Sequence, residues 1–263
     1  MTNFQDIITM TKRSFYLSLR SIDGWLTAFI LPVTILLAFV FIFGGAFAGA
    51  LNNSRDYLQY LLPGIFTMAI GQVATSTAVK ISSDKENGIL KRFQTMPILQ
   101  SSPLFGDTSI TILKSILSLI FVFIIASLLS FKWHGTGTSF IILGLVVILT
   151  VTLISWIGFL WGLFTGVETA GTLSFAFIFL PYISSAVVPL HTMPKILQIV
   201  GKYSPFTSVT EIFRSCLENT LTNSQLINFA LWYMPTIIIV VVFTLNKYKK
   251  YKKRKQTEVP HNC

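Results

Sequence analysis

The sequence predicts an all-α integral membrane protein with six transmembrane helices. Of its 263 residues, 52% are hydrophobic and only 11% are charged, and the mean hydropathy of +0.69 lies well above the usual range of soluble proteins. Six charge-poor runs approach or exceed the roughly 20 residues that a helix needs to cross a bilayer. The predicted spans, which form one domain over residues 25–246, are Trp25–Leu51, Tyr57–Val79, Ser109–Phe131, Ser139–Val167, Thr169–Leu190 and Leu226–Asn246.

Residues 1–24 precede the first span and predict an amphipathic helix in the membrane interface. Phe4, Ile8 and Phe15 fall near helical spacing on one side, and charged residues such as Asp6 lie on the other. A cleaved signal peptide is the competing interpretation. The apolar run that follows is 27 residues long, however, and a signal peptide has an apolar region of roughly 7–15 residues. We therefore expect an interfacial helix on the inner side of the membrane.

The basic residues predict which way the chain faces. Of the 20 Lys and Arg residues, 15 lie in the two ends of the chain or in loops on the same side as the ends. The positive-inside rule therefore places both termini and the loop 82–107 in the cytoplasm. Because this topology explains the net charge of +10, the sequence predicts no nucleic-acid partner. The basic tail 247–263 can also attract anionic membrane lipid.

The loop 82–107 lies between the second and third predicted spans and carries the strongest local signals for a short helix. Ser83 and Glu86 form an S-x-x-E capping box, which satisfies backbone donors at a helix start. Pro97 cannot continue a helix interior. We therefore expect a helix of about three turns over residues 83–97.

This short helix is predicted to be amphipathic. Ile89, Phe93 and Met96 fall on one apolar stripe, whereas Lys91 and Arg92 point away from it. One interpretation is a solvated connector that lies on the membrane surface. The other is a helix that docks against another protein through its apolar stripe.

A second unusual segment, residues 191–225, comes before the last span. Thr192 with Pro194 indicates one helix start, and Ser204 followed by Pro205 indicates a second. The segment is too short and too charged to cross the bilayer twice. We expect two short helices that dip into the outer leaflet as a re-entrant hairpin. An amphipathic pair lying on the outer surface is the alternative.

The second of these helices has an apolar face and a charged face. The apolar residues are Phe206, Val209, Phe213 and Leu217. On the charged face, Arg214 lies one turn from both Glu211 and Glu218, which is a spacing that allows ion pairs on a helix. We expect Arg214 to pair with these carboxylates.

The spans lack the residues that catalysis or ion-coupled transport would require. Lys114 interrupts a span only near its inner end, where it can snorkel to the interface. His134 and His191 stand alone, without the spacing of metal ligands. Lys114 is also the only Lys followed by Ser or Thr, and Leu113 stands where a phosphate loop needs glycine. The chain is therefore predicted not to be an enzyme, and any energy that it uses must come from a partner.

The two cysteines and the C-terminal end add no further site. Cys216 is predicted on the outer side and Cys263 on the inner side, so they cannot pair within one chain. His261 with Cys263 supplies only two metal ligands, which is too few for a stable metal site. We expect no cofactor and no metal in this chain.

The chain resembles the ABC-2-type permease family over nearly its whole length, in two stretches. The inner loop DKENGILKRFQTMPI is similar to the family's E-R-E-x-G-T-L-E-x-L-x-x-x-P segment, and it matches at Glu86, Gly88, Leu90 and Pro97. The outer stretch is similar to the family's P-x-x-x-M-P…P-L-T-x-x-x-x-x-x-R run, and it matches at Pro189, Met193, Pro194, Pro205, Thr207 and Arg214. The chain departs from the family at Lys91, where an acidic residue is usual, and at Ser184-Ser185, where Ser-Gly is usual.

The resemblance implies two functional sites. The first is a coupling helix that seats in a separate ATPase subunit, formed by Ser83, Glu86, Gly88, Ile89, Leu90, Phe93, Met96 and Pro97. The second is an outer re-entrant gate near the exit, formed by Pro189, Met193, Pro194, Pro205, Thr207 and Arg214. Similar proteins work as two membrane halves with two ATPase subunits, which hold the ATP and Mg²⁺.

These expectations combine into one functional hypothesis. It is a permease in the bacterial cytoplasmic membrane that acts as a homodimer or heterodimer and exports a hydrophobic or amphipathic compound. Phe175, Phe179 and Tyr182 bring aromatic rings to the fifth predicted span beside Pro181 and could line the path. The alternatives are a permease of the same family for polysaccharide or lipid-linked glycan, an ATP-independent carrier, and an immunity or assembly protein.

Overall fold

A computed structural model describes residues 3–43, 54–99 and 101–256 of the chain. These residues form helices and connecting turns and contain no strand, which confirms the all-α prediction. The helices are α1 (Asn3–Arg20), α2 (Ile22–Ala38), the π-helix η1 (Phe39–Phe43), α4 (Ser54–Glu86), α5 (Ile89–Thr95), α6 (Ser102–Leu128), α7 (Gly137–Phe164), α8 (Val167–Ala170), α9 (Leu173–Phe179), η2 (Leu180–Ile183), η3 (Leu190–Thr192), α10 (Lys195–Lys202), α11 (Pro205–Glu218) and α12 (Asn223–Gln256).

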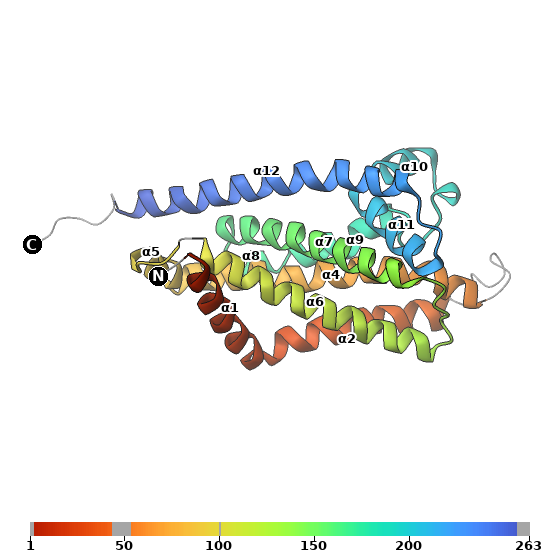
Figure 1. Ribbon diagram of the computed structural model, residues 1–263, viewed down its shortest axis with the longest axis horizontal. Coiled ribbons are helices and arrows are strands. Elements are labelled where there is room, and N and C mark those ends of the chain that lie inside the picture. The colour runs from red at the N-terminus through yellow and green to blue at the C-terminus, as the bar shows by residue number, and fades with distance from the viewer. Residues whose placement is uncertain (1–2, 44–53, 100, 257–263) are drawn as a thin grey trace, which may run out of the picture.

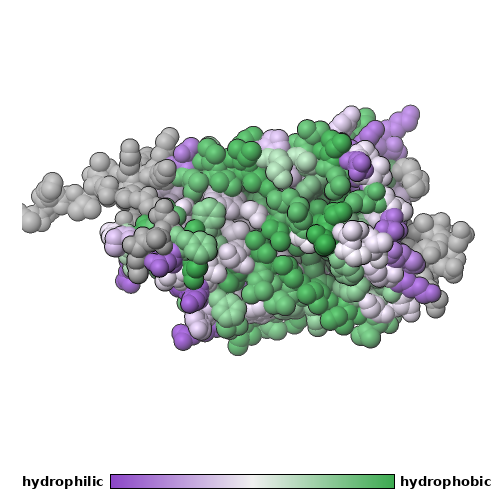
Figure 2. Space-filling model, viewed as in Figure 1, coloured by the Kyte–Doolittle hydropathy of each residue, from purple (hydrophilic) through white to green (hydrophobic). Residues whose placement is uncertain are grey.

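Five helical stretches in the described residues are long and apolar enough to cross a membrane. They are Gly24–Ile42, Tyr57–Glu86, Ser102–Leu128, Gly137–Phe164 and Asn223–Tyr248. They correspond to the first four predicted spans and to the last one. Figure 2 shows hydrophobic residues over the middle of the molecule and hydrophilic residues toward both ends, as expected for a multi-pass membrane protein.

The fifth predicted span, Thr169–Leu190, is not a continuous helix. The chain forms the short helices α8 and α9, continues as the 3₁₀-helix η2 and then passes through turns. The helix α8 ends at Ala170, with Gly171 as its C-cap residue, and Pro181 lies at the start of η2, where its missing N–H is tolerated. Overall apolarity suggested a continuous helical span, but the chain forms several short helices here.

The helix α4 forms the centre of the bundle and packs on α2, α6, α7, α9 and α11 (Figure 1). Its buried side chains include Leu61, Leu62, Ile65 and Ile70. The broken segment α8–η2 runs alongside α4 in the opposite direction. Val167 contacts Glu86 at one end of α4, and Ser185 contacts Tyr60 near the other.

The two ends of the bundle hold different elements. The N-terminus, α5 and the C-terminal end of α12 lie at one end, and α10 and α11 lie at the other (Figure 1). The helix α12 continues through the basic tail as far as Gln256, whereas the last span was predicted to end at Asn246. The end of the first predicted span, at 44–51, and the end of the tail, at 257–263, lie outside the described residues.

The helix α1 packs against α6 with its polar side inward. Asp6 and Ser14 are buried, whereas Phe4, Ile8 and Leu19 are exposed. This arrangement leaves the apolar side of the amphipathic helix exposed and gives its polar side a partner within the chain. The Asp6 carboxylate accepts a hydrogen bond from the Leu99 N–H at 3.0 Å, which ties α1 to the loop after α5.

Candidate functional site

The short helix at the inner loop begins later than the sequence predicts. Ser83 and Glu86 do not start a helix, because α4 runs on to Glu86. The turn comes at Gly88, which has a φ of +72° and so takes a left-handed conformation that is easy for glycine. The helix α5 follows as Ile89–Thr95, and Met96 is already extended. The capping-box prediction at Ser83 was therefore wrong, because the helical hydrogen bonding of α4 continues through it.

The helix α5 has one buried side and one exposed side. Leu90 and Phe93 are buried, with Phe93 only 6% exposed, in a cluster of apolar residues that includes Met10 and Trp156. The Arg13 guanidinium lies over the Phe93 ring at 4.8 Å from its centroid. The apolar stripe therefore faces the bundle at Phe93, which contradicts the interpretation that α5 docks on a partner through this residue.

The exposed side of α5 and of the turn after it is basic and partly apolar. Lys91, Arg92, Thr95, Met96 and Pro97 are exposed, and Ile89 is half-buried. These exposed residues lie at the end of the bundle where both chain ends also lie (Figure 1). We call Lys91, Arg92, Thr95, Met96 and Pro97 the α5 face. It offers two positive charges and a thioether to a binding partner.

The last turn of α4 holds the junction between α7 and α8. The Lys85 ammonium donates hydrogen bonds to the carbonyls of Gly162 and Leu163, both at 3.2 Å, and also contacts that of Thr165. These carbonyls belong to the C-terminal end of α7, where a positive charge is favourable. The Glu86 carboxylate accepts the Val167 N–H at 3.0 Å, at the N-terminus of α8. The end of α4 next to α5 is thereby tied to both elements. We call Lys85 and Glu86 with these partners the inner clamp.

At the other end of the bundle, the two predicted outer helices are present. The helix α11 begins at Pro205 after Ser204, as predicted, and the first outer helix, α10, begins at Lys195 after Pro194. Pro189 and Met193 lie at the two ends of the short η3 turn. Val209, Ile212 and Phe213 on α11 are fully buried, and α11 packs on α4, α7 and α12. The helix α11 is therefore part of the bundle core.

Arg214 binds backbone carbonyls and does not pair with the carboxylates that the sequence suggested. Its guanidinium donates to the Ser185 carbonyl at 3.0 Å and to the Tyr60 carbonyl at 3.2 Å, and it lies 3.9 Å from the Tyr60 ring centroid. The only ion pair within 4.0 Å among the described residues is Lys80–Asp107. The Ser185 carbonyl in the turn after η2 competes with the carboxylates for the guanidinium, because a carbonyl removed from water needs a hydrogen-bond donor.

Three side chains converge on Ser185. The Ser185 carbonyl accepts hydrogen bonds from the Tyr60 hydroxyl, at 2.8 Å, and from Arg214. The Ser185 N–H donates to the Thr207 hydroxyl at 3.4 Å. Thr207 in turn donates to the Gly201 carbonyl at 2.6 Å and so connects α10 to this group. We call Tyr60, Ser185, Thr207 and Arg214 the outer network. Of the predicted gate residues, it brings together Thr207 and Arg214.

The outer network depends on close packing at Gly64 of α4. A Cβ at this position would overlap the Ala186 carbonyl. Only glycine allows the turn after η2 to lie this close to α4. Sequence analysis missed Gly64, Tyr60 and Lys85, because a glycine or a tyrosine inside an apolar span and a lysine at its end are common features of membrane helices.

The aromatic residues proposed for a substrate path lie on α9 and η2. Phe175 and Phe179 lie one turn apart on α9 and are each 61% exposed. Phe177 is buried against α4, where it lies beside Gly71. Tyr182 is half-buried, with its ring centroid 6.3 Å from that of Phe179 and 6.0 Å from that of Phe39. Phe175 and Phe179 therefore present rings on the outside of this chain.

Cys216 does not present a reactive thiol at the outer end. Its side chain has an exposure of 0% on α11, and burial raises the pKa of the thiol to about 11. Among the described residues, there is no group of three His, Cys, Asp or Glu side chains that could hold a metal ion.

Comparisons with known proteins find sequence relatives over most of the chain. The sequence model of the family described as ABC-2 type transporter matches residues 5–217. The daunorubicin resistance ABC transporter permease protein DrrB1 of Streptomyces coeruleorubidus is 27% identical over 193 residues, which cover 73% of this chain and 67% of that protein.

Two further relatives carry the name of a transport permease, ycf38. The protein of Cyanophora paradoxa is 24% identical over 95% of this chain and 88% of its own length. The protein of Porphyra purpurea is 26% identical over 82% of this chain and 75% of its own length. The family match spans α1 to α11 and includes both the α5 face and the outer network. The chain belongs to the ABC-2 type transporter family.

Proposed function

We propose that this permease is the membrane subunit of an ATP-driven exporter that moves a hydrophobic or amphipathic compound out of a bacterial cell. Membership in the family supports an ABC transporter permease whose ATPase is a separate subunit. The described spans are strongly apolar, and a relative is named for resistance to daunorubicin. These two observations favour an apolar cargo over a glycan.

The observation that carries the proposal is the position of α4 between the α5 face and the outer network. From Tyr60 to Glu86 the helix extends about 39 Å at 1.5 Å per residue, which exceeds the hydrocarbon thickness of a bilayer. The inner clamp lies at one end of this rod, and Tyr60 and Gly64 lie near the other. A displacement of α5 by an ATPase would therefore move the turn at Ser185.

In this proposal the ATPase docks on the α5 face in the cytoplasm. The resemblance to the family's pattern from Glu86 to Pro97 supports a coupling segment at this position. Leu90 and Phe93 pack α5 against the bundle. A displacement of α5 by the ATPase would therefore also displace the helices that these residues contact. The ATP and Mg²⁺ belong to the ATPase subunit.

The broken segment α8–η2 supplies the sixth crossing in this proposal. It lies alongside α4 from Glu86 to Tyr60. This distance of about 39 Å is enough to cross the hydrocarbon layer of a bilayer. The positive-inside rule then places both chain ends in the cytoplasm. The helices α10 and α11 form the outer re-entrant segment, with Arg214 and Thr207 holding its inner edge.

A second permease half completes the path. Phe175 and Phe179 are exposed on α9, and Tyr182 follows them at the outer side of the segment. Two such chains could face each other across these rings and enclose an aromatic path for an amphipathic compound.

Transport by the reconstituted complex tests the proposal. The chain, its ATPase and the lipid would be assembled in vesicles, and uptake of fluorescent amphipathic drugs would be followed with and without ATP. We expect ATP-dependent accumulation, together with drug-stimulated hydrolysis. Accumulation without ATP would assign the chain to the carriers, and a complex that neither moves drugs nor responds to them would overturn the proposed cargo.

A further inference from the structure

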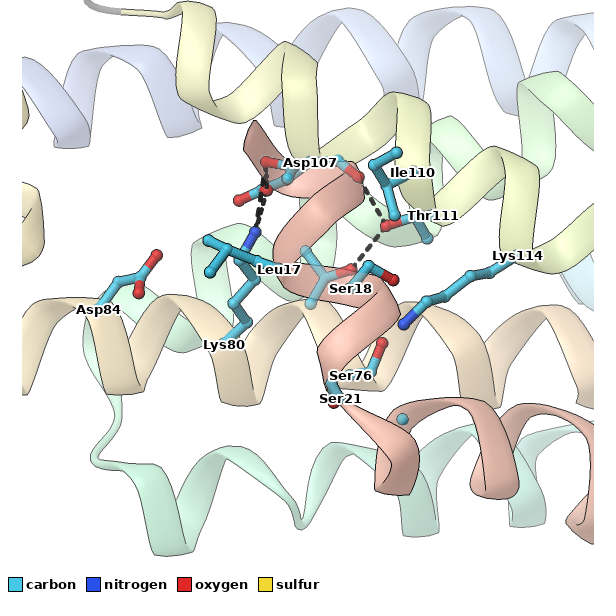
Figure 3. Close-up of a pocket in the computed structure, with 13 residues that line it drawn as sticks. Leu17, Ser18, Ser21, Ser76, Lys80, Asp84, Asp107, Ile110, Thr111 and Lys114 are labelled. Atoms are coloured by element: carbon cyan, nitrogen blue, oxygen red, sulfur yellow. Dashed lines mark hydrogen bonds and ion pairs between the residues drawn. The ribbon is translucent and has the colours of Figure 1, made fainter. Parts of the chain in front are cut away.

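A polar cavity lies between α1, α4 and α6, outside the two sites described above. Its volume is about 260 Å³. The lining includes the charged residues Lys80, Asp84, Asp107 and Lys114 and the hydroxyl residues Ser14, Ser18, Ser21, Ser76, Thr77 and Thr111. Figure 3 shows the Lys80 and Lys114 side chains extending into the space between these helices. This group is not apparent in the sequence, because its members come from three separate helices.

One side of the cavity is electrostatically satisfied. Asp107 pairs with the Lys80 ammonium and accepts the Ser14 hydroxyl at 2.5 Å. Asp84 lies on the same side, along α4 from Lys80 (Figure 3). Two carboxylates here share the positive charges of Lys80 and of the nearby Arg13. This side of the cavity needs no additional ligand.

The other side holds a cation without an acceptor. Lys114 is only 7% exposed, and its ammonium extends into the cavity instead of snorkelling away (Figure 3). Within the described part of the chain, no hydrogen bond or ion pair accepts its protons, and it lies over the Trp25 ring, 5.1 Å from the ring centroid. Burying an unpaired ammonium is costly unless an anion accompanies it. The four charged side chains that line the cavity sum to zero, but both carboxylates lie on the Lys80 side, so the Lys114 ammonium has no carboxylate paired with it.

A second unsatisfied group lines the same cavity. The Ser18 hydroxyl is buried and has no hydrogen-bond partner in the described structure. Buried hydroxyls are nearly always paired. An ammonium with three donors and a free hydroxyl donor in one cavity fit an acceptor with several oxygens, such as a phosphate.

The cavity lies where a membrane lipid would bring such a group. A Cβ on Gly24 would be 3.3 Å from the Lys114 Nζ, and Gly24 is the residue at which the apolar stretch of α2 begins. Trp25 beside it is typical of the boundary between headgroups and hydrocarbon. A shallow groove lined by Leu26, Ile30 and Leu31 starts two residues further along α2 and could hold an acyl chain.

We propose that this cavity binds a phosphate group, held by the Lys114 ammonium and the Ser18 hydroxyl, and that the membrane leaflet on the α5 side supplies it as a phospholipid headgroup. The site does not depend on the proposed cargo. It would anchor the elbow between α1 and α2 to the lipid, beside the helix that carries the α5 face.

Binding by the purified full chain tests this proposal. The chain would be reconstituted in discs of diglucosyl diacylglycerol, a lipid without phosphate, and titrated with phosphatidylglycerol or with inorganic phosphate. Lipid retention would be measured by native mass spectrometry and thermal stability by unfolding. The variants are Lys114→Met, which keeps the length without the charge, Lys114→Arg, which keeps the charge, and Lys195→Met, an exposed control at the other end.

We expect phosphatidylglycerol to raise the unfolding temperature of the wild type, and Lys114→Met to weaken this binding about tenfold or more, because a charge-assisted hydrogen bond is lost. Lys114→Arg and Lys195→Met should bind within about threefold of wild type. Ser18→Ala, which changes one hydroxyl only, should weaken binding by a smaller factor and serves if Lys114→Met fails to fold.

The two ligand arms identify the source of the phosphate. Binding of inorganic phosphate alone, with loss in Lys114→Met, keeps the phosphate site but overturns its assignment to lipid. Equal binding by wild type and Lys114→Met in both arms, or no binding by wild type in either arm, would overturn the site itself. None of these measurements uses ATP or transport, so failure here is distinct from failure of the exporter proposal.

Discussion

The two ends of α4 hold irregular backbone in different ways. In the inner clamp, Lys85 and Glu86 bind the ends of α7 and α8 with charged groups that are partly or fully exposed. In the outer network, Tyr60 and Arg214 bind Ser185, and the turn reaches α4 only because Gly64 has no side chain. The inner clamp thus uses solvated charges next to the exposed α5 face, whereas the outer network uses close packing. The outer end should therefore tolerate less change.

The largest effect is expected at Gly64. In Gly64→Ala the new methyl group would overlap the Ala186 carbonyl, so the turn must move and the outer network must open. Overpacking of this kind costs ~3 kcal/mol, which outweighs the gain in helix propensity. Thermal unfolding of the purified protein measures the loss.

Gly144→Ala on α7 is the matched control for Gly64→Ala. A Cβ there has nothing within 4 Å, so the same substitution should leave stability unchanged or raise it slightly. Equal stability of the two variants would contradict the close approach at the outer end.

A smaller loss is expected for Arg214→Ala. It removes two hydrogen bonds from a charged donor to half-buried carbonyls, for a loss of about 2 kcal/mol, whereas Arg214→Lys should keep part of the binding. Because Arg214 binds carbonyls and not Glu211, adding Glu211→Ala should not restore stability. Rescue by that second change would mean that an ion pair, and not the outer network, is what Arg214 provides.

The smallest effect on stability is expected at the inner clamp. Lys85→Met removes the donor for the end of α7, but water can reach these carbonyls, so we expect a loss of about 1 kcal/mol. Transport-coupled ATP hydrolysis should slow clearly even though the protein stays folded, because the junction between α7 and α8 is no longer tied to the end of α4. Wild-type coupling in Lys85→Met would remove the clamp from the transmission path.

The sequence could predict what depends on apolar length and on strong local signals. Five of the six predicted spans are present as long apolar helices, and Ser204-Pro205 starts α11 as predicted. The family resemblance through Glu86–Pro97 and Pro189–Arg214 was confirmed by the family match over residues 5–217.

The errors have a common physical origin in tertiary contacts. Periodicity on α5 showed that Phe93 is on an apolar face, but it could not show whether that face meets the bundle or another protein. Helical spacing predicted an ion pair between Arg214 and Glu211. In the structure, Arg214 instead donates to the backbone carbonyls of Tyr60 on α4 and of Ser185 in the turn after η2. Lys114 read as a snorkelling residue, because its cavity forms only when three helices meet.

Charge reversal on the α5 face tests the central claim most directly. Lys91→Glu with Arg92→Glu changes two exposed residues of α5, and Lys195→Glu with Lys202→Glu makes the same change in charge on exposed residues of α10. Both double variants should unfold at the wild-type temperature, since neither pair is buried. We predict that only the α5 variant loses the ATPase during co-purification. An α5 variant that keeps the full amount of ATPase would contradict the account, because the partner would then have to bind elsewhere.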